Sequence, residues 1–177
     1  MSETKIPWSE YSWNPVAGCT KIAAGCRNCY AETMAIRLKA IAEQDLRKKR
    51  IQCYRDVISD IDLSQGWNGN IICREDVLDD PLHWKKPKKI FVCSMSDLFH
   101  ERVPIGFLTH VFDVIEQCPQ HIFQILTKRP QQALDMMWGK HAKGWRYFGD
   151  NDYHKNIWFG VSVSTQADAD KNIPILL

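Results

Sequence analysis

Short apolar runs alternate with amphipathic stretches along this chain. Residues 89–94, 121–126 and 157–163 are short and almost wholly apolar, a pattern that predicts buried strands. Weaker strand signals lie at residues 11–14 and 70–74, beside Pro15, Gly18 and Gly66, which mark turns. Buried strands that alternate with helices are typical of a parallel sheet covered by helices, so we predict an α/β fold.

Four stretches between these runs have helical periodicity. The longest, residues 28–50, carries Met34, Leu38 and Ile41 at roughly helical spacing, and residues 104–118 repeat an apolar face. Pro130 begins a third helix that continues to Trp138, and a fourth begins near Gln166. These units are too few for a closed barrel. We therefore predict a single domain over residues 1–177, an open or partial (βα) barrel truncated at its C-terminus.

The composition restricts the class of protein. Hydrophobic residues make up 45% and charged residues 25%, as in globular proteins, and a net charge of +2 is too small to indicate nucleic-acid binding by itself. No apolar run reaches the length of a membrane span, and the N-terminus lacks an apolar secretory region. We expect a cytoplasmic protein with no membrane partner, whose thiols stay reduced.

Three of the seven cysteines cluster. Cys19, Cys26 and Cys29 have the spacing C-x6-C-x2-C, next to Gly18 and Gly25, which let the loop curl until the thiolates converge. The predicted helix that follows presents its N-terminus, which favours negative charge. The other four are scattered singly, and we expect them to be small core or surface residues: Cys53, Cys73, Cys93 and Cys118.

Three thiolates leave more than one kind of site open. A cubane [4Fe-4S] cluster on three cysteines keeps one iron free for a further ligand. A structural zinc site needs four ligands, so His100 or Cys53 would have to complete it. Three free thiols are the remaining interpretation. Trp8 and Trp13 flank the loop, where they could shield a cluster from water, although we expect ordinary core packing.

Several short motifs give the chain a family resemblance. It resembles an uncharacterised, phage-associated three-Cys-motif family that is itself similar to radical S-adenosylmethionine proteins. The matching residues are Trp13-Asn14-Pro15, Gly18-Cys19-Thr20-Lys21, Gly25-Cys26, Asn28-Cys29-Tyr30-Ala31-Glu32, Ser94-Met95-Ser96-Asp97-Leu98-Phe99-His100, Leu126-Thr127-Lys128-Arg129-Pro130 and Trp158-Phe159-Gly160-Val161-Ser162.

The resemblance implies an iron–sulfur cluster on Cys19, Cys26 and Cys29 and reductive cleavage of S-adenosylmethionine, with an electron donor as partner. Two features depart from the usual radical S-adenosylmethionine pattern. The first gap is x6 instead of x3, and the aromatic residue, Tyr30, follows the last cysteine instead of preceding it.

Polar residues follow three of the predicted strands. Ligands of parallel sheets bind beyond the carboxyl ends of the strands, so these residues are candidates for cofactor binding. Lys128 or Arg129 could pair with the cofactor carboxylate, and His100 and Glu101 could act as acid and base. Turn formation and helix capping explain many such residues equally well. The full set of candidates is Ser94, Ser96, Asp97, Lys128, Arg129 and Ser162.

Two functions stay in competition. The first is an enzyme that cleaves S-adenosylmethionine to act on an unknown substrate, conceivably nucleic acid. The second is a non-catalytic zinc or iron–sulfur module of a phage or mobile-element protein that binds nucleic acid or a protein partner. A fourth protein ligand at the cysteines would favour the second.

Overall fold

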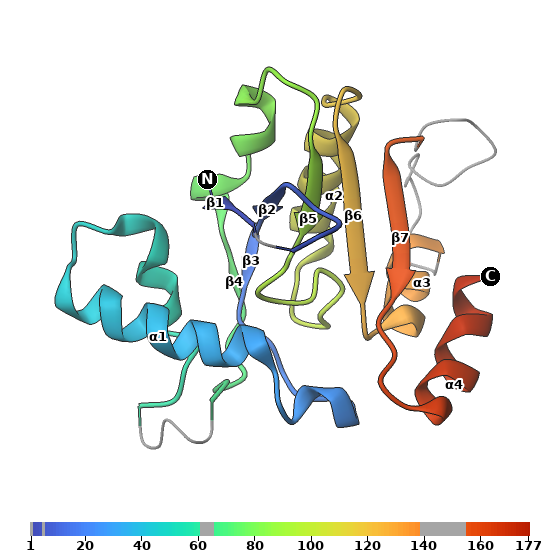
Figure 1. Cartoon of the computed structure of the whole chain (residues 1–177), viewed down its shortest axis with the longest axis horizontal. Helices are drawn as coiled ribbons and strands as arrows, with labels where there is room; N and C mark the ends of the chain where they lie inside the picture. The colour runs from blue at the N-terminus through green and yellow to red at the C-terminus, as the bar shows by residue number, and fades with distance from the viewer. Residues whose placement is uncertain (1, 5, 61–65, 139–154) are drawn as a thin grey trace.

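A five-stranded sheet forms the centre of the molecule (Figure 1). The computed structural model describes residues 2–4, 6–60, 66–138 and 155–177. In spatial order the strands are β1 (Ser2–Glu3), β2 (Tyr11–Trp13), β5 (Lys89–Val92), β6 (Ile122–Thr127) and β7 (Ile157–Val161). All neighbours pair in parallel except β1, which is antiparallel to β2. The predicted α/β class with a parallel sheet is confirmed.

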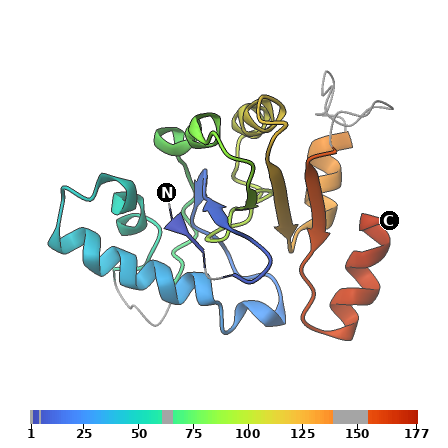
Figure 2. The ribbon, with the colours of Figure 1, turned by 45° about the horizontal axis from the view of Figure 1, so that its top comes forward.

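The two faces of the sheet have different neighbours. Side chains alternate along each strand, so Phe123 and Ile125 of β6 share one face. That face packs against α2 (Ile105–Glu116) and α3 (Pro130–Trp138), which lie on the same side of the sheet (Figure 2). The main hydrophobic core is therefore between the sheet and these two helices. The intervening residues point to the opposite face, which the N-terminal segment partly covers.

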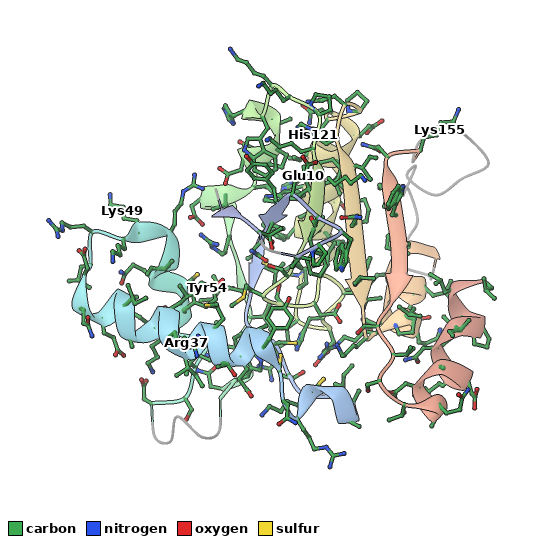
Figure 3. The ribbon with its side chains drawn as sticks, in the orientation of Figure 1. Glu10, Arg37, Lys49, Tyr54, His121 and Lys155 are labelled. Atoms are coloured by element: carbon green, nitrogen blue, oxygen red, sulfur yellow. The ribbon has the colours of Figure 1, made fainter. Side chains whose placement is uncertain are left out.

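A second, smaller core surrounds α1 (Tyr30–Gln44). The two-stranded ribbon of β3 (Val16–Ala17) and β4 (Ile72–Cys73) and the short helix η2 (Lys49–Arg55) pack against it. Tyr54, labelled in Figure 3, is buried between α1 and the ribbon. This core supports the chain segment in which the three cysteines lie.

Helix α1 ends earlier than the sequence predicts. The predicted helix over residues 28–50 stops at Gln44, since Asp45 adopts an extended conformation and its carboxylate binds Arg47. The side-chain amide of Gln52 donates hydrogen bonds to the carbonyls of Ala42 and Asp45. These contacts satisfy carbonyl groups that a continuing helix would have bonded internally.

The remaining elements are short or peripheral. They are η1 (Ala24–Cys26), η4 (Glu75–Val77), η5 (Asp80–His83) and α4 (Gln166–Leu176), the last packed beside α3 and β7. None of the helices in the described ranges is long and apolar enough to cross a membrane. The polar, aromatic sequence of residues 139–155 predicts a loop between α3 and β7, and nearly all of it falls outside the described residues.

Candidate metal and cofactor site

The three clustered cysteines line one cavity of about 400 Å³. Cys19 follows β3, Cys26 ends η1, and Cys29 is the N-cap residue of α1. Leu126, Lys128 and Arg129 at the end of β6 also line the cavity, so it lies at the carboxyl edge of the parallel strands. In Figure 1 the arrowheads of β6 and β7 point towards the end of the molecule that holds η1. The amino edge, where Glu10 and His121 are labelled in Figure 3, is at the other end.

Two glycines fix the course of the cysteine loop. Gly18 has a φ of +91°, and a Cβ atom there would lie 2.1 Å from the carbonyl oxygen of Asn70, so only glycine fits. Gly25 donates its backbone N–H to Ser164 Oγ at 3.0 Å, and a Cβ on Gly25 would lie 2.8 Å from that oxygen. Both glycines thus permit close approach of other parts of this chain to the loop.

Arg129 connects the loop to the sheet. Its Nη2 atom donates to Thr20 Oγ1 at 2.7 Å and to the Thr20 carbonyl at 3.2 Å, and its Nη1 atom lies 3.9 Å from Cys19 Sγ. The same guanidinium pairs with Asp97 at 3.4 Å and Glu101 at 3.3 Å. Arg129 is 8% exposed. With these partners it positions the loop, and its guanidinium is already occupied.

Asp97 is a second buried connector. Its carboxylate accepts hydrogen bonds from Thr127 Oγ1 at 2.8 Å and from the backbone N–H groups of Lys128 and Phe99 at 3.0 and 3.1 Å. Together with the Arg129 pair, these bonds join the segment after β5 to the end of β6. Asp97 and Arg129 therefore have a structural role whether or not a ligand binds.

Lys128 differs from its neighbours. Its ammonium donates to Ser162 Oγ at 3.0 Å, and among the described residues it contacts no carboxylate. Ser94 and Ser96, by contrast, donate to Asn14 Oδ1 and to the Val16 carbonyl at 3.1 and 2.8 Å. All of the predicted cofactor-binding residues line the cavity. Among them, the side chains of Lys128 and Ser162 bond to each other and to no other described residue. They are the pair best placed to exchange partners with an anionic ligand.

Burial and charge act in opposite directions on Cys19. Burial raises the pKa of the Cys19 thiol, while the guanidinium of Arg129 works to lower it. Lys21, two residues further along the loop, pairs with the carboxylate of Glu32 on α1 at 2.8 Å. The Arg129 guanidinium lies beside Cys19, and the N-terminus of α1 begins at Cys29. Both groups favour negative charge in this part of the cavity.

The structure separates the candidates for a fourth metal ligand. Cys53 and His100 do not line the cavity, whereas Cys93 does. Cys93 directly follows β5 with a φ of +58°, and its burial raises the pKa of its thiol to about 12. Within the described residues, no three His, Cys, Asp or Glu side chains are grouped so as to hold a single metal ion. Cys93 is buried in the main hydrophobic core, as expected, and it also lies at the wall of the cavity.

His100 has a structural environment. It is fully buried, and its Nδ1 atom accepts the backbone N–H of Arg102 at 3.2 Å, so the neutral ring carries its proton on Nε2. Nε2 lies 3.0 Å from Thr20 Oγ1, so the ring contacts the cysteine loop at Thr20. Burial, and then the charge of Arg129, lowers the pKa of His100. Glu101 is an exposed partner of Arg129.

Two aromatic residues outside the predicted set of site residues also line the cavity. Tyr30, the first residue of α1, lines the cavity and donates its hydroxyl to the Ser94 carbonyl at 2.5 Å. Trp8, expected in the core, is 44% exposed and lines the cavity, whereas Trp13 is buried as expected. An aromatic residue directly after the last cysteine is the signal that could have identified Tyr30.

One protein-family model matches nearly the whole chain. The model of a family described as "Protein of unknown function (DUF5131)" matches residues 3–177. Neither the curated proteins nor the solved structures give a match to the chain.

Proposed function

We propose that this chain, which belongs to the DUF5131 family, is an iron–sulfur protein of the radical S-adenosylmethionine type. In this proposal Cys19, Cys26 and Cys29 hold a [4Fe-4S] cluster and S-adenosylmethionine binds in the adjoining part of the cavity. The observation that carries the proposal is the single cavity of about 400 Å³ that these three cysteines share with Lys128 and Ser162. Each cysteine of a cubane cluster binds a different iron, so the sulfurs need not meet at one point.

The topology agrees with a partial barrel. The four parallel strands β2, β5, β6 and β7 lie across the sheet in the same order as along the chain. The helices that follow β5 and β6 both pack on one face of this sheet. Continued winding in this sense, with helices outside and strands inside, is how a (βα) barrel forms. The cavity would then lie at the carboxyl end of the barrel, where such enzymes bind their ligands.

The residues of this chain would have separate tasks. Lys128 would pair with the cofactor carboxylate by a charge-assisted contact, with Ser162 beside it. Ser94 and Ser96 would face the amino group or ribose, while Asp97 and Arg129 keep the loop in place. When bound, such a cluster supplies the electron that cleaves the carbon–sulfur bond of S-adenosylmethionine, and an electron donor must reduce it. The substrate stays open.

Metal analysis tests the cluster. After anaerobic reconstitution the chain should hold about four irons and about four sulfides. Cys19→Ser should lose most of this iron, whereas Cys53→Ser should keep it, because Cys53 lies outside the cavity. Under a strong reductant, the loaded protein should release 5′-deoxyadenosine from S-adenosylmethionine. Stoichiometric zinc in place of iron would refute the proposal.

Cofactor binding tests the task of Lys128. Loss of a charge-assisted contact of this kind should weaken binding of S-adenosylmethionine to the loaded protein by at least about tenfold in Lys128→Gln. Arg37→Gln is the matched control, since Arg37 is exposed on α1, away from the cavity. Equal affinity of the two variants would remove Lys128 from the site.

Cys93 supports a second candidate, a closed metal module without catalysis. Four thiolates around one centre would leave no position for S-adenosylmethionine, and the protein would serve a mobile element by binding nucleic acid or a protein partner. Cys93→Ala discriminates the two. An open site should retain its iron and its cofactor binding in this variant, and a closed site should lose metal as severely as Cys19→Ser does.

A further inference from the structure

The face of the sheet opposite α2 and α3 carries a row of unusual side chains. Phe91, Gln124 and Trp158 are in register on three adjacent parallel strands. They therefore project side by side from one face. Parallel sheets normally bury both faces under apolar residues, so an amide between two aromatic rings needs an explanation.

A groove of about 240 Å³ opens on this row. Trp8, Gln124, Leu126 and Trp158 line it, together with Phe159 and Gly160. Trp8 packs edge-on against Phe91 with ring centroids 4.8 Å apart, which holds its indole in place. Trp8 and Trp158 are 44% and 51% exposed, so each leaves part of its aromatic surface exposed, and Lys89 Nζ lies over the Trp158 ring at 5.9 Å from its centroid. A Cβ atom on Gly160 would lie 2.6 Å from Leu126 Cδ2, so the glycine allows the Leu126 side chain to pack closely against the floor of the groove.

Gln124 has an unsatisfied acceptor in this groove. Its side chain is among the buried polar groups, at 7% exposure, and its Nε2 donates to the Trp8 carbonyl at 3.2 Å. Its Oε1 atom is buried and accepts no hydrogen bond from any described residue. Leaving a buried acceptor unpaired is costly, and such atoms in native proteins commonly await a water or a ligand.

The groove adjoins the cysteine cavity. Trp8 and Leu126 line both, and along β6 the residues Gln124, Leu126 and Lys128 follow one another on the same face. Three successive positions of this kind span about 13 Å. A ligand bound in the groove would thus lie directly beside the cavity that the three cysteines line, so one molecule could occupy both.

We propose that this groove binds a planar nitrogen heterocycle of the substrate, a ring of the nucleobase class whose N–H donates to Gln124 Oε1. Its ring stacks on the exposed indoles of Trp8 and Trp158, because aromatic surfaces bind bases of any sequence by stacking. The Gln124 acceptor adds selectivity for rings that carry an N–H donor. The assignment of the ring to the substrate rests on the proposed function, whereas ring recognition does not.

Calorimetric titration of the full-length, metal-free chain tests the recognition. Adenosine should bind, and purine riboside, which lacks the amino donor, should bind at least about fivefold more weakly. In Gln124→Leu this preference should disappear. Trp158→Ala should weaken adenosine binding about tenfold through lost stacking, and Trp158→Phe should recover most of it. Near-parent urea midpoints of the variants exclude unfolding as the cause.

Titrations with further ligands identify the molecule from which the ring comes. A short single-stranded adenine oligonucleotide that binds with the same dependence on Gln124 would mark a base within a strand, and binding of adenosine alone would mark a free nucleoside; both support the proposal. S-adenosylhomocysteine that binds at least about tenfold more tightly than adenosine, with the same dependence on Gln124, would identify the groove as the adenine site of the cofactor and would overturn the substrate assignment. Equal affinity of the parent and Gln124→Leu for adenosine, or no binding to either, would overturn ring recognition. Iron analysis after reconstitution is independent of these titrations, so a protein that takes up no iron on reconstitution but binds adenosine would contradict only the proposed function.

Discussion

Removal of the Arg129 guanidinium should destabilise the metal-free protein strongly. Arg129→Met keeps much of the side chain's apolar volume but leaves the carboxylate of Asp97 without its charged partner. The two side chains are only 6% and 7% exposed, so solvent screens the lost charge pair little. Breaking a buried pair from one side costs about 3–5 kcal/mol. Because Thr127 and two backbone N–H groups still donate to Asp97, we expect the lower value, about 3 kcal/mol.

Urea denaturation measures this cost. With a slope of about 2 kcal/mol/M, the unfolding midpoint of Arg129→Met should fall by about 1.5 M. The surface pair of Arg47 and Asp45 provides the control, since Arg47 is 92% exposed and Arg47→Met should leave the midpoint unchanged. In a double-mutant cycle with Asp97→Asn, the coupling between the two positions should exceed about 1 kcal/mol. A coupling near zero would refute the conclusion that this pair fixes the cysteine loop to the sheet.

The remaining predictions concern the loop and its support. His100 has a lowered pKa in the fold, so its neutral form contributes stability above the ordinary histidine pKa of about 6.5, and this contribution declines as the pH falls towards the folded-state pKa. Urea titrations from pH 7.5 to 5.5 should therefore show the stability advantage of the parent over His100→Gln shrinking with acidity; a constant difference would contradict this. Gly18→Ala should lose at least about 2 kcal/mol, whereas Gly106→Ala, exposed in the first turn of α2 with no atom within 4 Å of the added Cβ, should gain about 0.5–1 kcal/mol by the same assay. Equal effects at the two glycines would contradict the close approach to Asn70.

Strong local patterns made most of the fold predictable. The apolar runs at 89–94, 121–126 and 157–163 became β5, β6 and β7, and Pro130 begins α3 as expected. The early end of α1 was not predictable, because it depends on Gln52 returning to bond the last carbonyls, a tertiary contact that helical periodicity does not encode. The barrel remains a proposal.

The sequence was sufficient to predict which polar residues line the cavity, but not what each side chain does there. Parallel strands end at one edge, which is why residues chosen as strand-end polar groups line the same cavity as the cysteines. Their hydrogen bonds could not be read from the sequence. These bonds separate Arg129, whose guanidinium contacts four neighbours, from Lys128, whose ammonium bonds only to Ser162 among the residues that the structure describes. Gln124 gave no signal, since a polar residue within an apolar strand acquires meaning only from its neighbours across the sheet.

The distances along the chain between the cysteine loop and its supports impose an order on biosynthesis. Cys19, Cys26 and Cys29 leave the ribosome early, but the groups that shape their loop, at Arg129 and Ser164, are made a hundred or more residues later. Until then the nascent thiols are flexible and open to oxidation or to capture of unwanted metals. An inorganic centre held by these cysteines would therefore meet its fully supported loop only after Ser164 has been translated.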